Sequence, residues 1–260
     1  MAPPDPTLDD DLALAHRLVD LASEVALEFF HRGVETIVKA DNSPVSEADL
    51  EVDRRMLGVL AAERPDDAVL SEESGERAGG DRRWILDPID GTFNFVEGHP
   101  AWGTHVALEV DGELALGVIS RPVYEQRYWA TRGGGAYMRG TGATDASTPT
   151  QLHVSTTSDL AQSRVTAWSN PPASRLASLR GACVFVEPAS LDNILAVATG
   201  ELEAVIGSRG KIWDHAPAVI IVTEAGGAFR DREGGQRLDL GTSRYTNGRI
   251  DADLHALLDG

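Results

Sequence analysis

The chain has 260 residues, of which 42% are hydrophobic and 25% are charged, a balance typical of a globular protein with a substantial core. Its formal net charge of −18 argues against binding to nucleic acid or to an anionic membrane. The single cysteine, Cys183, excludes an internal disulfide and lies in an apolar run, which favours a core position. We see no signal peptide and no apolar run long enough to span a bilayer, so we expect a cytoplasmic protein.

Hydrophobic periodicity predicts two helices near the start of the chain, over residues 12–31 and 47–63. Ser46 and Asp49 are spaced as in a capping box, which would begin the second helix. Alternating apolar residues on both sides of Asp111-Gly112 predict a β-hairpin. The strands that we expect in this half cover residues 68–70, 84–86, 104–110, 114–120 and 128–130.

Residues 140–150 are rich in Gly, Thr, Ser, Asp and Pro, and we expect a boundary there. Residues 1–150 would form an α+β half with most of the metal ligands, and residues 151–260 an α/β half, together one compact catalytic unit. The fold class is therefore α/β in the broad sense. The elements that we expect in the second half are strands at 164–168 and 183–186 and helices at 173–180, 191–199 and 215–225.

The segment Trp84–Phe95, with the sequence WILDPIDGTFNF, carries the clearest chemical signal. We expect its strand to stop at Asp87, because the following proline has no N–H to donate. Asp87 and Asp90 then present carboxylates, with the carbonyl of Ile89 between them, which suits a hard divalent cation. Thr92 follows where backbone N–H groups could meet a phosphate. For one Asp-Gly turn taken alone, a turn without a ligand is the better interpretation.

Two further carboxylates lie far away in the sequence. Glu72 follows the strand predicted at 68–70, and Asp214 is expected to precede and cap a helix that has Pro217 in its first turn. With Asp87 and Asp90, they make four carboxylates at the ends of elements, where side chains can converge on a cleft. Such a cluster, without histidine or cysteine ligands, favours magnesium, manganese or calcium over zinc.

These motifs resemble those of the inositol monophosphatase superfamily of magnesium-dependent, lithium-sensitive phosphomonoesterases. The resemblance covers most of the chain and rests on Ser71–Ser74, Asp87–Phe95, and Trp213-Asp214 with Glu224–Gly227. It implies a layered αβαβα sandwich of the sugar-phosphatase type, with the metal cleft between the halves. We also expect a homodimer.

The resemblance implies two or three Mg²⁺ ions per site, with Mn²⁺ as a possible replacement. Glu72, Asp87 and the Ile89 carbonyl would hold the first ion, and Asp87 would bridge to a second ion shared with Asp90 and Asp214.

The catalytic residues implied by the resemblance are Thr92, Asp49 and Glu72. Thr92 would orient the attacking water together with Asp49, and Gly91 and Thr92 would offer backbone N–H groups to the phosphate. For Asp49 a purely structural role as part of the helix cap is the alternative.

The substrate is less well defined by these motifs. Gly98–Trp102 and Arg127–Gly133 are most similar to bacterial histidinol-phosphate and inositol phosphatases. Gly207 stands where many members of the family have a glutamate that contacts substrate hydroxyls, which argues against inositol. Pro188–Ser190 likewise replaces a Gly-Ser/Thr-Ala segment that borders the substrate.

Three residues are candidate substrate contacts, namely Ser190, Arg209 and Lys211. The two cations could bind a second anionic group, and the alternative is that they are solvated loop residues. We interpret His99, His105 and His215, which lie near the motifs, as non-catalytic.

The predicted function is magnesium-dependent hydrolysis of a small phosphate monoester, such as histidinol phosphate, an inositol phosphate or a sugar phosphate, by metal-activated water. One alternative is a 3′-phosphoadenosine 5′-phosphate phosphatase. The other is a non-catalytic regulator that binds metal or phosphate, whose expected signature is loss of a metal carboxylate or of the threonine; none is lost here.

Overall fold

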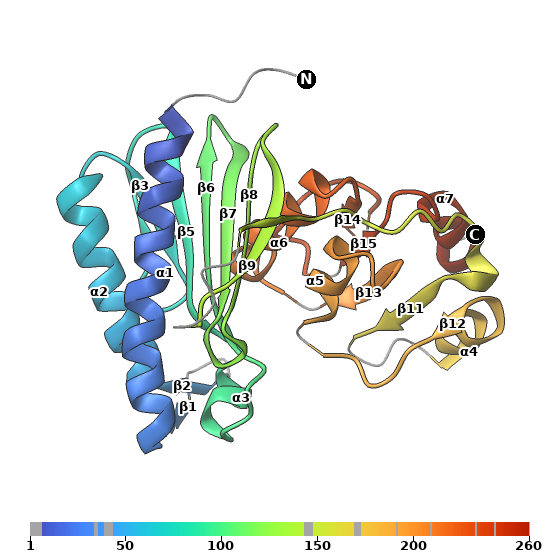
Figure 1. Cartoon of the computed structure of the whole chain (residues 1–260), viewed down its shortest axis with the longest axis horizontal. Helices are drawn as coiled ribbons and strands as arrows, with labels where there is room; N and C mark the ends of the chain where they lie inside the picture. Colours follow the sequence, from blue (N-terminus) through green and yellow to red (C-terminus); the bar gives the residue numbers. More distant parts are fainter. Residues whose placement is uncertain are drawn as a thin grey trace.

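The computed structural model of the chain describes residues 7–33, 36–38, 44–142, 148–168, 173–190, 192–208, 210–231, 233–241 and 243–259. Its elements form five layers, in which three layers of helices alternate with two sheets (Figure 1). The helices of these layers are, in order, α1 (Thr7–Arg32) and α2 (Glu47–Glu63), then α5 (Asn193–Ala198) and α6 (Ile212–Glu224), then α4 (Ala173–Ala182) and α7 (Asp251–Asp259). The predicted αβαβα sandwich is confirmed.

The larger sheet has eight strands in the order β10-β9-β8-β7-β6-β5-β3-β4, and only β3 and β5 pair in parallel. The strands are β3 (Ala68–Ser71), β4 (Gly75–Arg77), β5 (Arg82–Asp90), β6 (Gly103–Val110), β7 (Glu113–Arg121), β8 (Gln126–Thr131), β9 (Gly135–Gly140) and β10 (Thr150–Gln151). The predicted hairpin is β6-β7. Its two turn residues, Asp111 and Gly112, have φ of 54° and 77°, as a tight type I′ turn requires.

The smaller sheet has five strands in the order β12-β11-β13-β15-β14. Its strands are β11 (Arg164–Ala167), β12 (Val184–Phe185), β13 (Ala204–Ser208), β14 (Ala228–Asp231) and β15 (Ser243–Thr246). The short elements outside the two sheets are β1 (Thr36–Val38), β2 (Pro44–Ser46), α3 (Thr92–Val96), η1 (Pro122–Tyr124) and η2 (Leu160–Gln162). The predicted boundary at 140–150 includes residues 143–147, which lie outside the described residues, and the division of the chain at residue 150 stays a prediction.

Helix α1 begins at Thr7, earlier than the apolar periodicity predicts. Asp9 and Asp10 lie in its first turn, where negative charge favours the helix dipole. Its apolar face packs on β6 and β7 and on α2. Three large aromatic side chains, Trp84, Phe95 and Trp102, are fully buried in the same core, which fixes the end of the sheet that carries the Trp84–Phe95 motif.

The prediction that the strand stops at Asp87 is wrong. β5 continues to Asp90, and its pairing with β6 shifts register between Asp87 and Asp90. Pro88 lies inside this shift and beyond the last residue of β5 that pairs with β3, so its missing N–H interrupts no regular ladder. The Pro88 carbonyl instead accepts a hydrogen bond from Thr104 Oγ1 at 2.9 Å.

Helix α6 also begins earlier than predicted, at Ile212, so Asp214 lies inside the first turn and Pro217 in the second. The helix lies between the two sheets (Figure 1), and its residues 215–222 are all buried. A helix that is apolar on every side can be stable only in such a position. The position of Asp214 is therefore set by packing on both sheets rather than by a surface loop.

Candidate functional site

Three of the predicted metal ligands meet at one end of the larger sheet. Carboxylate oxygens of Glu72, Asp87 and Asp214 all lie within 4.8 Å of one another. Glu72 follows β3 directly, and its backbone N–H donates to the Leu86 carbonyl at 3.1 Å, which ties it to the strand that carries Asp87. Asp214 reaches the same point from the first turn of α6. Residues that are 142 positions apart in sequence, from 72 to 214, thus share one small volume.

A second group of possible ligand atoms consists of Asp87, Asp90 and His105, again within 4.8 Å of one another. His105 Nε2 lies 3.4 Å from Asp90 Oδ2. Asp87 belongs to both groups, which is the arrangement that a bridging ligand needs. Sequence reasoning set His105 aside. The pairing of β5 with β6 shows why His105 belongs to this group, because it lies directly opposite Asp87 on the neighbouring strand.

The electrostatics of this cluster are unfavourable without a cation. Asp87 is 1% exposed, and neither of its oxygens has a hydrogen-bond partner among the described residues. Burial, followed by the charges of Glu72, Asp90 and Asp214, raises the pKa of Asp87 well above its ordinary value. Burial also raises the pKa of Asp214 to about 7, although the Lys211 N–H, which donates to it at 2.6 Å, acts in the opposite direction.

The donor set fits a hard divalent cation. Four carboxylates and the carbonyl of Ile89 supply oxygen ligands, which magnesium and manganese prefer, and the imidazole of His105 could be added at an Mn²⁺ site. A cation at this point would also give the unpartnered oxygens of Asp87 a positive neighbour. The shape and chemistry of the cluster thus agree with the predicted metal site.

Asp49 and Thr92 form a pair beside the cluster. The Thr92 hydroxyl lies 3.1 Å from Asp49 Oδ1 and 3.2 Å from the Ile89 carbonyl. The other oxygen of Asp49 accepts the backbone N–H of Ser46 at 2.8 Å, so the capping box is also present. The two interpretations of Asp49 are therefore compatible, because one oxygen caps α2 and the other contacts Thr92. Burial is the main cause that raises the pKa of Asp49.

Gly91 has φ of 84° at the junction between β5 and α3, a conformation that favours glycine and turns the chain sharply after Asp90. The turn brings Thr92 back toward the carbonyl of Ile89. Whether the N–H groups of Gly91 and Thr92 bind phosphate stays a prediction.

A small pocket of about 60 Å³ adjoins the carboxylates. It is lined by Asp90, His105, Ile119, Arg121, Trp168, Ile194, Leu195, Gly210, Asp214, His215 and Ala218. Arg121 was missed by sequence reasoning, because nothing in its local sequence separates it from other residues at strand ends. Its side chain is 2% exposed and forms an ion pair with Asp192.

Among the described residues, neither Ser190 nor Lys211, two of the predicted substrate contacts, lines this pocket. Ser190 accepts the Asp192 N–H at 3.1 Å and so helps to begin α5, whereas Lys211 is the N-cap residue of α6. Arg209 lies outside the described residues. Gly207 has φ of 76°, and a methyl group there would lie 3.1 Å from the Trp168 carbonyl oxygen. A glutamate at position 207 would therefore be strained in this backbone.

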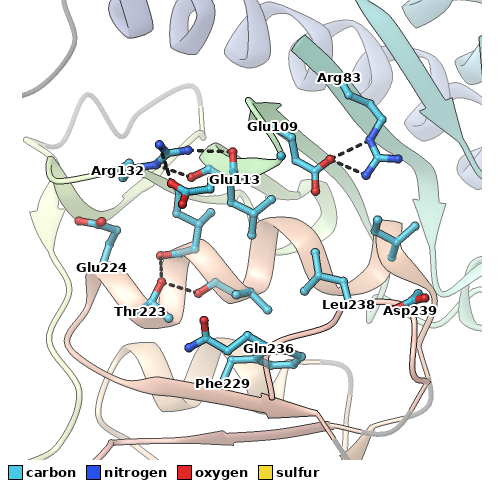
Figure 2. Close-up of a pocket in the computed structure, with 15 residues that line it drawn as sticks. Arg83, Glu109, Glu113, Arg132, Thr223, Glu224, Phe229, Gln236, Leu238 and Asp239 are labelled. Carbon is cyan, nitrogen blue, oxygen red and sulfur yellow. Dashed lines mark hydrogen bonds and ion pairs between the residues drawn. The ribbon is translucent and has the colours of Figure 1, made fainter. Parts of the chain in front are cut away.

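A larger cavity of about 780 Å³ lies along α6, beside the β6-β7 turn (Figure 2). Its charged side chains all have partners, and Asp239 pairs with Arg237, which does not line the cavity. Arg83 Nε donates to Glu109 at 2.7 Å, Arg132 lies 3.2 Å from Glu113, and Glu224 accepts the N–H groups of Gly133 and Gly135 at 2.8 and 3.0 Å. We place the chemistry at the smaller pocket, because only there do unpartnered polar groups and clustered carboxylates coincide.

None of the helices in the described part of the chain is both long and apolar enough to cross a membrane.

Comparison with known proteins agrees with this geometry. The model of the inositol monophosphatase family matches residues 7–258. A Streptomyces griseus protein named glucose-1-phosphate thymidylyltransferase is 47% identical over 89% of this chain and 89% of its own, and a Streptomyces coelicolor histidinol-phosphatase is 35% identical over 96% and 97%. The solved structure of a Thermotoga maritima IMPase superposes with a TM-score of 0.83 at 25% identity, over 96% of this chain and 97% of that one. The chain therefore belongs to the inositol monophosphatase family, a family of phosphoric monoester hydrolases.

Proposed function

We propose that this protein is a magnesium-dependent phosphatase that hydrolyses a small phosphate monoester by attack of an activated water. The observation that supports this most strongly is the environment of Asp87. This carboxylate is fully buried, has no hydrogen-bond partner among the described residues, and is shared by two groups of possible metal ligands. A buried carboxylate in that state is stabilised either by protonation, as its raised pKa allows, or by a positive charge placed against it, and the two ligand groups that share Asp87 favour the second.

The ligands that we assign to the cations are Glu72, Asp87, Asp90, Asp214 and the carbonyl of Ile89, with His105 as a further candidate at the Asp90 side. When bound there, divalent cations would neutralise phosphate charge and lower the pKa of a coordinated water. The Lys211 N–H holds one oxygen of Asp214, which leaves its other oxygen for this role. Glu72 acts as a ligand and, by its position, as a candidate partner for the reacting water.

Asp49 and Thr92 are the residues that would orient the water. The Thr92 hydroxyl has one proton, and when it donates this proton to Asp49 its lone pairs can accept a hydrogen bond from water. Burial raises the pKa of Asp49, which makes it a better proton acceptor than an exposed aspartate. The Gly91 and Thr92 backbone N–H groups would hold the phosphate in line with this water.

The identity of the ester is a narrower proposal. Relatives named histidinol-phosphatase and a relative named for glucose 1-phosphate suggest an amino-alcohol phosphate and a sugar phosphate as first candidates. We further propose a cytoplasmic homodimer with inhibition by lithium. The net charge of −18 supports a small phosphorylated metabolite as the partner, rather than nucleic acid or a membrane.

A phosphate-release panel with Mg²⁺ tests the proposal. It contains histidinol phosphate, inositol 1-phosphate, glucose 1-phosphate and adenosine 3′,5′-bisphosphate, each with and without chelator. We expect release from at least one ester, partial activity with Mn²⁺, and none with chelator. Glucose 1-phosphate is also incubated with dTTP, because pyrophosphate release without phosphate release would show nucleotidyl transfer instead. Tight metal binding without turnover of any ester would support a non-catalytic regulator.

A further inference from the structure

Asp53 is a buried carboxylate that has no part in the mechanism proposed above. It lies on α2, is 2% exposed, and forms no ion pair with the described residues. Its two oxygens instead accept two hydroxyl groups, Oδ1 that of Ser71 and Oδ2 that of Ser74. Burial of a carboxylate without a cationic partner is unfavourable, so these two hydrogen bonds are its compensation. What they hold is the turn that carries Glu72.

This turn, residues 71–74, is held unevenly by the sheet. On its first side, the Glu72 N–H donates to the Leu86 carbonyl of β5 at 3.1 Å. On its second side, the chain enters β4, a strand of three residues at the edge of the sheet, two of which are exposed. Short, exposed edge strands open easily. The hydrogen bond from Ser74 to Asp53 therefore ties the weaker side of the turn to the interior.

Helix α2 is a rigid support for the turn. It packs on the larger sheet beside α1 (Figure 1), and its residues Val52 and Met56 are fully buried. Asp53 lies four residues after Asp49, so both carboxylates project from the same face of the helix. Asp49 contacts the Thr92 hydroxyl at 3.1 Å. One face of α2 thus contacts both the threonine that would orient water and the turn that carries a metal ligand.

The position of Glu72 has little tolerance if it is to bind a cation together with its neighbours. Its carboxylate lies within 4.8 Å of those of Asp87 and Asp214. Oxygen ligands of Mg²⁺ lie about 2.0–2.1 Å from the ion in a nearly octahedral arrangement, so small displacements weaken binding. Asp87 lies in β5 and Asp214 in α6, whereas Glu72 lies in a turn. Of these three ligands, Glu72 is the one that most needs support from elsewhere.

We propose that Asp53 is a positioning residue of the metal site, which fixes the turn of residues 71–74 and so holds Glu72 where a cation needs it. The proposal rests on the proposed function and deepens it, because Asp53 acts through Glu72 and touches neither the cation nor the ester. An ionised carboxylate suits this role. It accepts both hydroxyls at once, and hydrogen bonds to a charged acceptor are about twice as strong as those between neutral groups.

The first test compares Asp53→Asn with the wild type in metal binding. The substitution keeps the size of the side chain but replaces one oxygen by an amide nitrogen, which cannot accept a hydroxyl proton. Binding of Mn²⁺ is measured without any ester, by counting the free ion with electron paramagnetic resonance. We expect the dissociation constant of the tightest Mn²⁺ ion to rise about tenfold or more, as is typical when a group that orients a metal ligand is changed.

Glu51→Gln is the matched control for this measurement. Glu51 lies two residues earlier on the same helix, and its carboxylate also accepts from two side chains, those of Arg54 and Arg55, at 2.8 and 2.7 Å. These hydrogen bonds are exposed and do not reach the turn, so Mn²⁺ affinity should change by less than about twofold. A change in Asp53→Asn no larger than that in Glu51→Gln would overturn the proposal.

Double variants show which ligand Asp53 acts through. In a protein that already carries Glu72→Ala, the turn presents no ligand, so Asp53→Asn should not weaken Mn²⁺ binding further. In a protein that carries Asp214→Asn, the same substitution should weaken binding by the factor seen in the wild type. A general effect of Asp53 on the fold would weaken binding in both backgrounds alike, and that result would contradict the proposal.

Ser74→Ala covers the case in which Asp53→Asn does not fold. It removes one hydroxyl from the exposed side of the turn and leaves Asp53 in place. We expect the Mn²⁺ dissociation constant to rise about threefold, as loss of one hydrogen bond predicts, and the rise should be absent in the Glu72→Ala background. An unchanged dissociation constant in Ser74→Ala would overturn the proposal.

Activity separates this inference from the proposed function. In a phosphatase, the Mg²⁺ concentration for half-maximal rate should rise in Asp53→Asn by the factor seen for Mn²⁺, while kcat at saturating Mg²⁺ stays within about threefold. Mn²⁺ binding that depends on Asp53, without hydrolysis of any ester, would refute the phosphatase alone. Hydrolysis by the wild type, with unchanged Mn²⁺ binding in Asp53→Asn, would refute the positioning role alone.

Discussion

The two cavities along helix α6 differ in how their polar groups are satisfied. The large cavity is lined by ion pairs such as Arg83–Glu109 and by Glu224, which accepts two backbone N–H groups. The small pocket and the adjoining cluster contain Asp87, Arg121 and His215, each with a buried atom that has no partner among the described residues. Volume alone would point to the large cavity. We propose the small pocket as the functional one, because buried polar groups without partners are rare in folded proteins and a bound ligand can complete them.

The largest effect should come from Asp87→Asn. The amide keeps the shape of the side chain and removes the charge of the ligand shared by both groups, so we expect kcat to fall by about a thousandfold or more. Mg²⁺ titration of the activity should show weaker binding. The control is Glu224→Gln in the large cavity, for which we expect a change in kcat of less than about twofold. Comparable losses in both variants would contradict the distinction between the cavities.

Thr92→Ala should have the next largest effect. It removes the hydroxyl that contacts Asp49 at 3.1 Å, and we expect kcat to fall about 10²-fold while Mg²⁺ affinity stays within about threefold. Ser46→Ala is the matched control, because it removes the hydroxyl that donates to the other oxygen of Asp49 and accepts the Asp49 N–H, and it should lower the melting temperature more than kcat. A Thr92→Ala variant that loses metal binding in proportion to activity would show that the hydroxyl supports the metal site instead.

The stability of the metal-free protein should depend on pH through Asp214. Its folded-state pKa is raised by burial to about 7, above the unfolded value near 4, so its contribution is complete below pH 4 and is lost as pH rises to about 7. In chelator, the melting temperature should therefore fall between pH 4 and 7 by more in the wild type than in Asp214→Asn. Mg²⁺ should restore the wild type at pH 8. An identical fall in the melting temperature of both proteins would show that ionisation of Asp214 does not destabilise the folded protein.

The smallest effect is expected at the rim of the large cavity. Glu113→Ala removes the partner of Arg132, and the two side chains are 74% and 45% exposed. Such a pair contributes no more than about 0.5 kcal/mol, and Arg132 keeps its hydrogen bonds to the carbonyls of Leu114 and Glu113. Urea unfolding should show a change in the free energy of unfolding within that limit, and kcat should be unchanged. A fall of more than about 2 kcal/mol in the free energy of unfolding would show that this ion pair stabilises the fold more than the exposure of its side chains indicates.

Much of the fold follows from local signals in the sequence. The Asp111-Gly112 turn and the Ser46 capping box were predicted, because turn chemistry and capping depend on residues close in sequence. The layered architecture was instead implied by the family resemblance. Two of the errors concern prolines. Pro88 lies inside β5 and Pro217 inside α6, and in both cases tertiary packing keeps the element intact across a residue that local rules treat as a breaker.

The candidate site was predictable only where its residues belong to recognisable motifs. The four carboxylates stand in such motifs, and three of them meet within 4.8 Å. His105 and Arg121 do not. The position of His105 depends on the register of β5 with β6, and that of Arg121 on its ion pair with Asp192 at the start of α5, and neither can be read from the residues beside them. Ser190 and Lys211 stay predicted substrate contacts: the Ser190 hydroxyl accepts the Asp192 N–H and the Lys211 backbone N–H donates to Asp214, and neither residue lines the small pocket.

Asp214 comes from a different layer of the fold than the other proposed metal ligands, so a bound cation would connect two layers. Glu72, Asp87, Asp90 and His105 all come from the larger sheet or its ends, whereas Asp214 is carried by a helix that also packs against the smaller sheet. A cation held by both groups would therefore link the larger sheet to α6 and add to the stability of their packing. By the same linkage, a substitution that weakens the packing of α6 on the smaller sheet should also lower the affinity for Mg²⁺. The affinity for Mg²⁺ would then report on how well the two sheets are packed together.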